Sequence, residues 1–259
     1  MAGEARDTQV SVERDGHVGI VTFDRPPHNY FDGASVGDLL AVFQALDGDP
    51  DCRAILLRAA GSVFCAGAQF GSDGKDVDAD AAMRIYRSAI ALFEVRKPIV
   101  AAIQGAAIGG GLGLALVADF RVASTRASFS ANFARLGIHS GFGISATLPR
   151  VVGLQAAALM LETGRRIDAS EALRTGLAES VVEPQALDGA ALALAAEIAS
   201  GAPLAVQSMR QTLFGDRADV VRRAIEREIA EQRIHFHTDD FREGIRAAYK
   251  RETPAFKGR

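Results

Sequence analysis

The chain is organised around one glycine-rich stretch, Gln104-Gly105-Ala106-Ala107-Ile108-Gly109-Gly110-Gly111-Leu112-Gly113-Leu114-Ala115-Leu116. Apolar residues precede and follow the glycines, which indicates a buried strand that leads into a buried helix. Glycines leave backbone N–H groups open to a ligand, and a helix that begins there adds the positive end of its dipole. The stretch therefore predicts a site for an anion or an oxyanion.

The spacing of these glycines does not match the common nucleotide-phosphate loops. The chain contains no Gly-x-x-x-x-Gly-Lys-Ser/Thr, and the run from Gly109 to Gly113 fits Gly-x-Gly-x-x-Gly in no register. Bare backbone donors suit an oxyanion instead, and removing one such donor typically costs about 2.7–4 kcal/mol of barrier. The alternative, that the glycines only permit close helix packing, fits the pattern equally well.

The composition is that of an ordinary globular chain, with 259 residues of which 48% are hydrophobic and 24% charged. The formal net charge of -3 gives no sign of a general nucleic-acid or membrane-surface binder. Two cysteines, Cys52 and Cys65, cannot build a disulfide framework or a cysteine zinc site, which predicts a reducing, cytoplasmic compartment. The polar residues 1–7 do not resemble the start of a signal peptide.

One uncharged run, Ile99 to Ala118, imitates a membrane span. Gly105, Gly109 and Gly113 within it even have the GxxxG spacing of paired membrane helices. The glycines and Gln104 weaken that interpretation, and the chain on either side has the composition of a soluble protein. We therefore interpret the run as a fully buried strand followed by a fully buried helix.

The rest of the chain predicts alternating strands and helices, and then helices alone. Residues 9–14 and 18–23 flank Asp15-Gly16, which is typical of a β-hairpin. Short strands are expected at 54–57, 120–123 and 128–130, and helices at 34–46, 81–95, 153–162, 169–175, 187–200, 203–213, 218–236 and 239–251. This order predicts an α/β fold of repeated ββα units with a helical region after them.

Few side chains near the glycine stretch could transfer a proton. His139 lies in a glycine-flanked loop, where an imidazole could act as a general acid or base. The alternative is a loop histidine hydrogen-bonded to the backbone. His235 and His237 stand at i and i+2, so they point to different sides of a helix and do not suit a shared metal ion. A solvated loop explains the clustered carboxylates Asp73, Asp76 and Asp78.

Two stretches together resemble the crotonases, the family of enoyl-CoA hydratases, enoyl-CoA isomerases and their relatives. The family's first oxyanion segment resembles Phe64-Cys65-Ala66-Gly67-Ala68-Gln69-Phe70, and its second resembles Ile99 to Gly105 continued through Gly109-Gly110-Gly111. Two further sequence motifs of the family resemble Leu148 to Gly153 and Glu171 to Ala178. The resemblance covers about residues 18 to 256, nearly the whole chain.

The resemblance implies a crotonase-like spiral of ββα units with a helical C-terminal region. We expect residues 1–200 to form the acyl-CoA-binding core and residues 201–259 a helical oligomerisation region. Relatives form trimers or pairs of trimers, so a homotrimer or a dimer of trimers is expected here. No cofactor is implied beyond the coenzyme A of the substrate, and neither a nucleic acid, a membrane nor a metal ion is expected as a partner.

The resemblance also assigns the site. The backbone N–H groups of Ala68 and Gly110 would hold the thioester oxygen of a bound acyl-CoA, where an enolate puts negative charge. Arg251 and Phe256 fall where relatives contact coenzyme A, often from a neighbouring subunit. The remaining positions implied for acyl-CoA binding are Pro27, His28, Asn29, Ala66, Gln69, Phe70, Gly71 and Phe133.

The chain departs from the family at its acid and base positions. Hydratases of the family use two glutamates, and the matching positions here are Gly113 and Phe133. A third position, which carries Asp or Glu in some isomerases and hydrolases, matches Gly141. None of these three residues can transfer a proton, which argues against simple hydration.

An oxyanion hole without a strong base suits reactions that form the enolate by losing something other than a proton. Decarboxylation of a malonyl-type thioester is the simplest example, and retro-Claisen cleavage is a related reaction. His139 is the first candidate to protonate the enolate, ahead of Tyr86 and the acidic residues of the loop at 71–80. An acyl-CoA lyase or isomerase is therefore expected, and the alternative is an acyl-CoA-binding protein without turnover.

Overall fold

The computed structural model of the chain describes residues 9–68 and 79–259. It opens with the expected hairpin, in which β1 (Val10–Asp15) pairs antiparallel with β2 (Val18–Phe23). The turn places Gly16 at φ +53°, which glycine adopts without strain. The first helix follows, α1 (Gly33–Gly48), with Asp32 as its N-cap.

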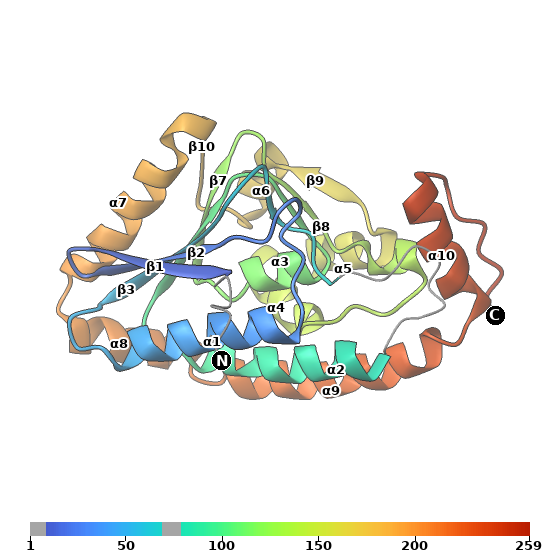
Figure 1. Cartoon of the computed structure of the whole chain (residues 1–259), viewed down its shortest axis with the longest axis horizontal. Coiled ribbons are helices and arrows are strands. Elements are labelled where there is room, and N and C mark those ends of the chain that lie inside the picture. The colour runs from blue at the N-terminus through green and yellow to red at the C-terminus, as the bar shows by residue number, and fades with distance from the viewer. Residues whose placement is uncertain (1–8, 69–78) are drawn as a thin grey trace, which may run out of the picture.

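The strands form two sheets. The larger sheet has the order β1-β2-β3-β5-β7-β10, with β3 (Ala54–Ala59), β5 (Ile99–Ile103), β7 (Phe120–Ser124) and β10 (Ser180–Val182). The smaller sheet has the order β4-β6-β8-β9, with β4 (Val63–Cys65), β6 (Ala106–Ile108), β8 (Ser128–Ser130) and β9 (Arg166–Asp168). From β3 to β8 the successive strands alternate between the two sheets, whereas β1 and β2 both lie in the larger sheet and β8 and β9 both lie in the smaller one. The alternation from β3 to β8, with helices between the strand pairs, confirms the spiral of ββα units (Figure 1).

Helices cover both faces of the larger sheet (Figure 1). On one face α7 (Leu187–Ser200) packs its alanines against β2, β3, β5 and β7. The main core lies on the other face, between the sheet and α1 with most of the other helices. These are α2 (Ala79–Ala89), η1 (Ile90–Glu94), α3 (Gly110–Ala115), η2 (Asn132–Leu136), α4 (Ile144–Val152), α5 (Leu154–Thr163), α6 (Ala169–Thr175), α9 (Arg217–His235) and α10 (Asp239–Lys250). Two further helices, η3 (Pro184–Ala186) and α8 (Pro203–Phe214), contact α7.

The uncharged run Ile99 to Ala118 folds differently from the single strand and helix that we expected. It forms β5, then a break at Gly105, then β6, and only then the six residues of α3. The break has a steric cause, because a Cβ at position 105 would lie 2.0 Å from the carbonyl oxygen of Ser62. Among the described residues no single helix has the length and apolar composition to cross a membrane, although the bent pair 184–200 and 203–235 meets that test jointly.

The expectation of a helical region after the ββα units misses two strands. β9 and β10 each join a sheet there, and β10 extends the larger sheet parallel to β7. Three-residue strands are too short to show the alternation by which strands are recognised.

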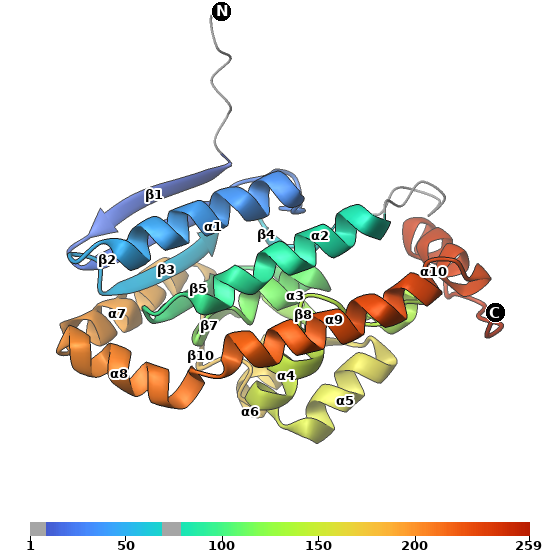
Figure 2. The same ribbon diagram turned by 90° about the horizontal axis from the view of Figure 1, so that it is seen from below.

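The C-terminal helices pack on the core over part of their length. Figure 2 shows α9 lying beside α2, and the two helices are in contact. Asp119 fixes the start of this region, since its buried carboxylate accepts hydrogen bonds from Arg210 (2.8 Å) and Arg217 (2.9 Å). By contrast, α8 has no buried residue and exposes Leu204, Met209 and Leu213. The predicted boundary at residue 200 falls at the end of α7.

Candidate functional site

Two glycine segments from different units meet at one corner of the fold, at Gly67 and Gly110. Gly67 follows β4 with φ +84°, a conformation that side-chain-bearing residues rarely adopt. A Cβ on Gly67 would lie 2.9 Å from the carbonyl oxygen of Ile108 and 3.0 Å from the amide nitrogen of Gly110. Only glycine therefore allows this close approach, and we call the two segments, Gly67–Ala68 and Gly109–Gly110, the glycine corner.

The direction of two N–H groups at the glycine corner follows from their peptide planes. The carbonyl of Gly67 accepts a hydrogen bond from the N–H of Phe31 (2.9 Å), so the N–H of Ala68, in the same trans peptide, points the opposite way. The carbonyl of Gly109 accepts from the N–H of Gly113 (3.2 Å), so the N–H of Gly110 points out of α3. Both N–H groups that the sequence predicts as oxyanion donors therefore lie on adjoining segments and point away from these backbone partners.

Close packing, the alternative explanation of the glycines, also holds within α3. A Cβ at position 111 would lie 1.9 Å from the carbonyl oxygen of Cys65, so Gly111 lets α3 rest directly on β4. The thiol beneath is not a nucleophile, because burial raises the pKa of Cys65 to about 12. The glycine run thus serves two purposes, with Gly110 at the corner and Gly111 against the sheet.

The segment 24–31 is held against the glycine corner by Asn29. Its buried side chain donates to the carbonyls of Ala60 (2.8 Å) and Val63 (2.7 Å), and accepts from the N–H of Arg25 (2.7 Å). Asn29 therefore positions the segment rather than offering its amide to a ligand. Its neighbours Pro27 and His28 are exposed.

One sequence pattern near this segment could be mistaken for a nucleophile. Gly33-Ala34-Ser35-Val36-Gly37 has the spacing Gly-x-Ser-x-Gly, but it opens α1 instead of joining a strand to a helix. The buried hydroxyl of Ser35 accepts from the N–H of Asp32 (2.9 Å) as part of a capping box. Ser35 is thus a structural residue.

Aromatic rings occupy the space where side chains at two of the acid and base positions would stand. A Cβ on Gly113 would lie 2.6 Å from Cδ1 of Phe142, and a Cβ on Gly141 would lie 2.5 Å from Cε2 of Tyr86. The third such position, Phe133, is buried. The residues that the sequence matches to family carboxylates are therefore brought together, with rings in place of acids.

These rings form a continuous surface that begins over the glycine corner. A Cβ on Gly110 would lie 2.4 Å from Cζ of Phe31. The ring centroids of Phe31 and Phe142 are 5.4 Å apart, and those of Phe142 and Tyr86 are 6.2 Å apart. We call Phe31, Phe142 and Tyr86 the ring wall. Phe142 has a φ of +63°, which is rare for a bulky residue, and this conformation carries its side chain into the wall.

His139 lies beside the ring wall and is half-buried. Its Nδ1 is 3.0 Å from the carbonyl oxygen of Ser140, and its backbone N–H donates to Nδ1 of His235 (3.0 Å). Its carbonyl accepts from Nε2 of Gln232 (2.8 Å). The loop at 139 is therefore tied to α9 through backbone atoms, and an acid or base role for the imidazole stays a prediction.

Sequence analysis missed two polar residues of α9 that support this loop, Glu228 and Gln232. The fully buried carboxylate of Glu228 accepts from the N–H groups of Gly143 (2.8 Å) and Ser145 (3.0 Å) and from the Ser145 hydroxyl (2.6 Å). Both residues fall on the apolar stripe that buries Val221, Ile225 and Ile229. A polar residue within an otherwise apolar helical stripe was the available signal.

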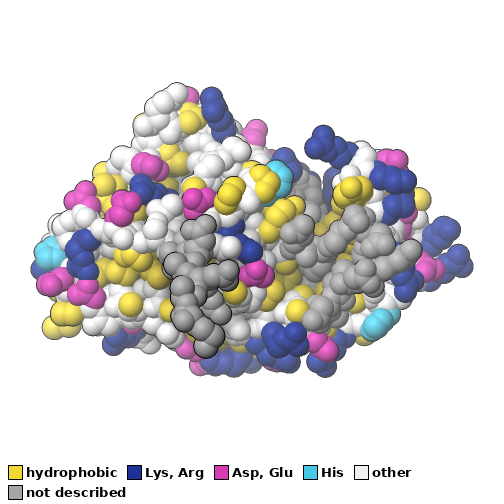
Figure 3. Space-filling model, in the orientation of Figure 1, with side chains coloured by type: hydrophobic (Ala, Val, Ile, Leu, Met, Phe, Trp, Pro, Cys, Tyr) yellow, Lys and Arg dark blue, Asp and Glu magenta, His cyan; other side chains and the backbone are white. Residues whose placement is uncertain are grey.

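The C-terminal tail carries the predicted coenzyme A contacts Arg251 and Phe256, both partly or fully exposed. Asp240 accepts hydrogen bonds from the N–H groups of Lys257 (2.6 Å) and Gly258 (2.7 Å), which fixes the tail to α10. Figure 3 shows Lys and Arg side chains gathered at the end of the molecule where Figure 1 places α10. Neither residue adjoins the glycine corner through a described contact.

Some predicted positions are not part of the structure that is described. Gln69, Phe70 and Gly71 lie outside the described residues, as do Asp73, Asp76 and Asp78. Within residues 9–68 and 79–259, no group of three or more His, Cys, Asp or Glu side chains could hold a metal ion.

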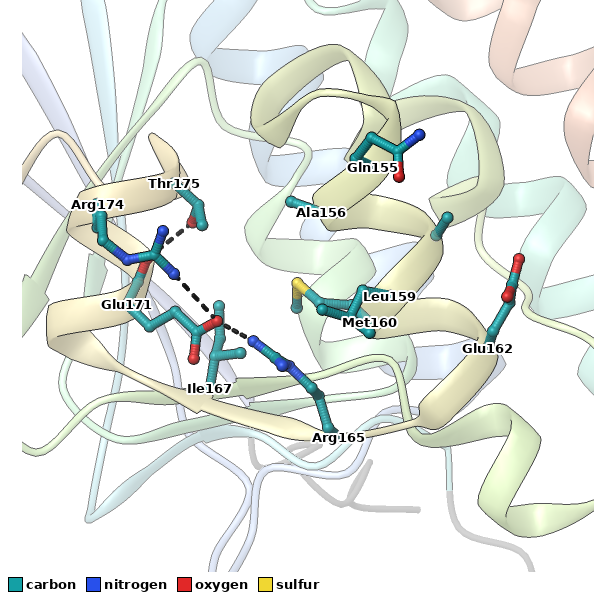
Figure 4. A pocket seen from close by; sticks show the side chains of 11 residues that line it. Gln155, Ala156, Leu159, Met160, Glu162, Arg165, Ile167, Glu171, Arg174 and Thr175 are labelled. Carbon is teal, nitrogen blue, oxygen red and sulfur yellow. Dashed lines mark hydrogen bonds and ion pairs between the residues drawn. The ribbon is translucent and has the colours of Figure 1, made fainter.

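A hollow of about 430 Å³ lies elsewhere, between α5, β9 and α6. Figure 4 shows Glu171 paired with both Arg165 and Arg174 on one side of it, while Leu159 and Met160 line the other side. None of the predicted site residues lines this hollow. We therefore place the candidate site at the glycine corner and ring wall.

Comparison with known proteins identifies the family of the chain. Residues 13–259 match the family model described as enoyl-CoA hydratase/isomerase. The chain is 36% identical over 253 residues to the (E)-benzylidenesuccinyl-CoA hydratase of Thauera aromatica, covering 96% of this chain and 99% of that protein. It is 35% identical over 260 residues to the carnitinyl-CoA dehydratase of Proteus mirabilis, covering 94% and 96% of the two chains.

Solved structures give the same result. An enoyl-CoA hydratase/isomerase from Pseudoalteromonas atlantica superposes with a TM-score of 0.85 at 30% identity, covering 96% of this chain and 100% of the other. DspI from Pseudomonas aeruginosa superposes with a TM-score of 0.77 at 32% identity, covering 99% of each chain. The protein therefore belongs to the enoyl-CoA hydratase/isomerase family of the crotonase superfamily, whose members act on acyl-CoA thioesters.

Proposed function

We propose that this protein holds an acyl-CoA enolate at the glycine corner and performs lyase or isomerase chemistry on it, with decarboxylation of a malonyl-type thioester as the simplest case. One observation carries the proposal: the N–H groups of Ala68 and Gly110 stand on adjoining segments and point away from their own backbone partners. Such paired donors stabilise the charge that develops on a thioester oxygen. Catalysis then requires, in addition, a bond at the α-carbon whose electron pair can pass into the enolate when the bond breaks.

The ring wall supports a reaction that needs no strong base. Hydration needs a group that takes a proton from water, and positions 113, 133 and 141 supply none. Loss of CO2 from a malonyl-type thioester leaves its electron pair on the enolate without prior proton removal. That reaction then consumes one proton at the α-carbon, so it needs a donor rather than a base.

The rest of the acyl-CoA would run from the glycine corner along the exposed segment at Pro27 and His28. Basic side chains near Arg251 suit the phosphates of coenzyme A. We further propose that the exposed apolar residues of α8 are covered in a homotrimer or a dimer of trimers in the cytoplasm.

The acyl group that we favour includes an aromatic or otherwise bulky apolar part. The ring wall lies beside the donors, and aromatic rings pack well against one another. The Thauera relative is a hydratase of (E)-benzylidenesuccinyl-CoA, whose acyl group bears a phenyl ring. A substrate panel should therefore contain aryl-substituted thioesters beside aliphatic ones.

A second candidate function is acyl-CoA binding without turnover. The observation that favours it is the absence of a carboxylate at 113, 133 and 141, the positions that the family resemblance matches to acids. The two candidate functions differ in whether a bound thioester exchanges its α-proton or releases CO2.

The test uses a panel of saturated, enoyl and malonyl-type acyl-CoA esters in deuterated water, followed by NMR and mass spectrometry. We expect α-deuterium incorporation or CO2 release that falls about 10²–10³-fold in Gly110→Pro, because proline removes one oxyanion donor. Proline is tolerated at the first position of a helix, where Gly110 stands.

The matched control is Gly110→Ala, which brings a Cβ against Phe31 just as proline does but keeps the N–H group. Equal losses in the two variants would show that sterics, not the donor, cause the effect. Binding of CoA esters with no exchange by the unmodified protein would favour the non-catalytic candidate. Absence of any binding would refute both candidates.

A further inference from the structure

We infer that Tyr86 is the proton donor of the site and that Gln232 positions its hydroxyl. The inference rests on the proposed function, because it concerns how the enolate held at the glycine corner is converted to product. It names a side chain for the step that the three acid and base positions leave without one. Tyr86 comes from α2, and Gln232 comes from α9, the helix beside it (Figure 2).

The phenol ring of Tyr86 occupies the space beside Gly141. Tyr86 is 1% exposed, and its Cζ, the atom that carries the hydroxyl, lies 2.6 Å from where a Cβ of Gly141 would be. Its ring packs edge to face on Phe142, which in turn contacts the Phe31 ring over Gly110. Tyr86 thus supplies the one hydroxyl of the ring wall, next to the backbone of Gly141.

The Gln232 amide nitrogen lies next to the Tyr86 ring. Its Nε2 donates to the carbonyl of His139 (2.8 Å), and a carbonyl can only accept, so the nitrogen must face that way. The same nitrogen lies 2.9 Å from where a Cβ of Gly141 would be, and Tyr86 Cζ lies 2.6 Å from that point. In our inference Nε2 is therefore placed to donate to the phenol oxygen, which leaves the phenol's own proton for another acceptor.

The other end of the same amide carries an unpartnered atom. Gln232 is fully buried, and its Oε1 is one of two buried side-chain N or O atoms without a hydrogen-bond partner among the described residues. Buried polar atoms are normally hydrogen-bonded, so this open acceptor indicates a donor that the described residues do not supply.

The protonation state of Tyr86 suits a donor and excludes a base. Burial is the largest influence and raises the pKa of Tyr86 well above its ordinary value, and the nearby Glu228 charge raises it further. The Gln232 hydrogen bond lowers it, but less than burial raises it. The phenol is therefore neutral at physiological pH and can give a proton to a strongly basic carbanion.

The other titratable groups around Tyr86 are already engaged. The Glu228 carboxylate accepts three hydrogen bonds from Gly143 and Ser145 at the start of α4. Nδ1 of His139 is directed to the carbonyl and hydroxyl of Ser140, at 3.0 and 3.4 Å. Tyr86 is thus a titratable group beside Phe142 and Gly141 whose proton has no acceptor among the described residues.

With a malonyl-type thioester, the reaction begins when the bond between the α-carbon and the carboxylate breaks. CO2 leaves, and the electron pair becomes an enolate held by the N–H groups of Ala68 and Gly110. The enolate then collapses, and the α-carbon takes the proton from Tyr86 Oη. Gln232 Nε2 holds the resulting phenolate until water returns a proton to it, and the hydroxide so formed is neutralised by the buffer.

The test compares Tyr86→Phe with Tyr249→Phe, an exposed tyrosine of α10 that serves as the matched control. The substrate is an α-substituted malonyl thioester in deuterated water, so that the configuration of the new C–D bond can be read. We expect Tyr86→Phe to lower kcat about 10²–10⁴-fold with KM within twofold, since general acid catalysis contributes that much. The residual product should carry deuterium in both configurations, whereas the unmodified protein and Tyr249→Phe should give one.

Gln232→Leu provides the second variant if Tyr86→Phe does not fold, and it should also lose stereochemical purity. Unchanged kcat and configuration in Tyr86→Phe would overturn the inference, and so would an effect on KM alone, which would make the phenol a binding group. Loss of configuration in His139→Gln but not in Tyr86→Phe would assign the donor to His139 instead. Turnover that disappears in Gly110→Pro but persists in Tyr86→Phe would reject this inference and leave the proposed function standing.

Discussion

The glycine corner and the ring wall face the same candidate site but are built in opposite ways. The corner consists of backbone atoms, and its geometry depends on Gly67 and Gly110 having no side chain. The wall consists of side chains, and its shape depends on which rings fill the space above Gly113 and Gly141. In the reaction that we propose, the backbone would stabilise negative charge, and most substitutions leave the backbone in place. Proton transfer would depend on side chains and could change with one residue.

The largest effect is expected from breaking the corner by Gly67→Ala. The new Cβ would lie 3.0 Å from the Gly110 nitrogen, in a backbone conformation at φ +84° that alanine resists. We expect turnover to fall about 10²–10³-fold, the loss typical of one oxyanion donor. Steady-state kinetics measures this, with binding of a CoA ester followed separately.

Gly37→Ala is the matched control for that variant, because it lies on α1 with nothing within 4 Å of the added Cβ. Its turnover should equal that of the unmodified protein. Full activity in Gly67→Ala would show that the two segments need not approach closely.

A smaller effect is expected from crowding the wall by Gly113→Ala. The added Cβ would meet Phe142 at 2.6 Å, and overpacking of a buried site costs about 1–3 kcal/mol. Urea denaturation should show this loss, and the double variant Gly113→Ala/Phe142→Ala should show a non-additive free energy of unfolding. Simple additivity of the two single variants would mean that the ring moves aside freely.

The smallest effect is expected away from both regions, at the C-terminal tail. The carboxylate of Glu243 accepts a hydrogen bond from the N–H of Ala255 (3.0 Å). The pKa of Glu243 is lowered to about 2, chiefly by its hydrogen bonds with Arg246 and next by the one from Ala255. A lowered folded-state pKa means that the stabilisation is complete above about 4.5 and is lost as the pH falls toward 2. Hydrogen exchange of the Ala255 amide should lose protection over that window.

Glu243→Gln should remove the pH dependence of the protection of the Ala255 amide against exchange, while turnover at neutral pH should stay unchanged. Protection of this amide that does not change with pH in the unmodified protein would contradict the assignment. The Glu243→Gln variant therefore separates the ordering of the tail from the chemistry of the glycine corner and the ring wall.

One half of the corner could be predicted from its own residues, because the glycine run at 109–113 indicates an open backbone by itself. Its pairing with Ala68 was expected only from the family resemblance, and the close approach of Gly67 to Gly110 came from the structure. The wall could not, because its members come from the segments at Phe31, Tyr86 and Phe142, and no local pattern states that these rings meet. Gln232 was missed for the same reason, since its partners, His139 and Tyr86, lie far from it along the chain.

The fold shows the same division between local and distant information. The hairpin and α1, α6 and α7 lie where periodicity and capping predict them. The short strands β9 and β10 escaped detection because their pairing with β8 and β7 depends on tertiary contacts and not on their own residues. Sequence patterns thus located most elements, and the register that brings them together came from the structure.

The unusual backbone of Phe142 has a consequence for how such a site can change over time. With φ at +63°, Phe142 fills the volume that any side chain at position 113 would enter. A glutamate therefore cannot be accommodated at 113 by a single substitution while the ring remains, because the new side chain would be expelled or would distort α3. Phe142 would have to be replaced as well. The absence of an acid at position 113 is in that sense maintained by a neighbouring residue and not by position 113 alone.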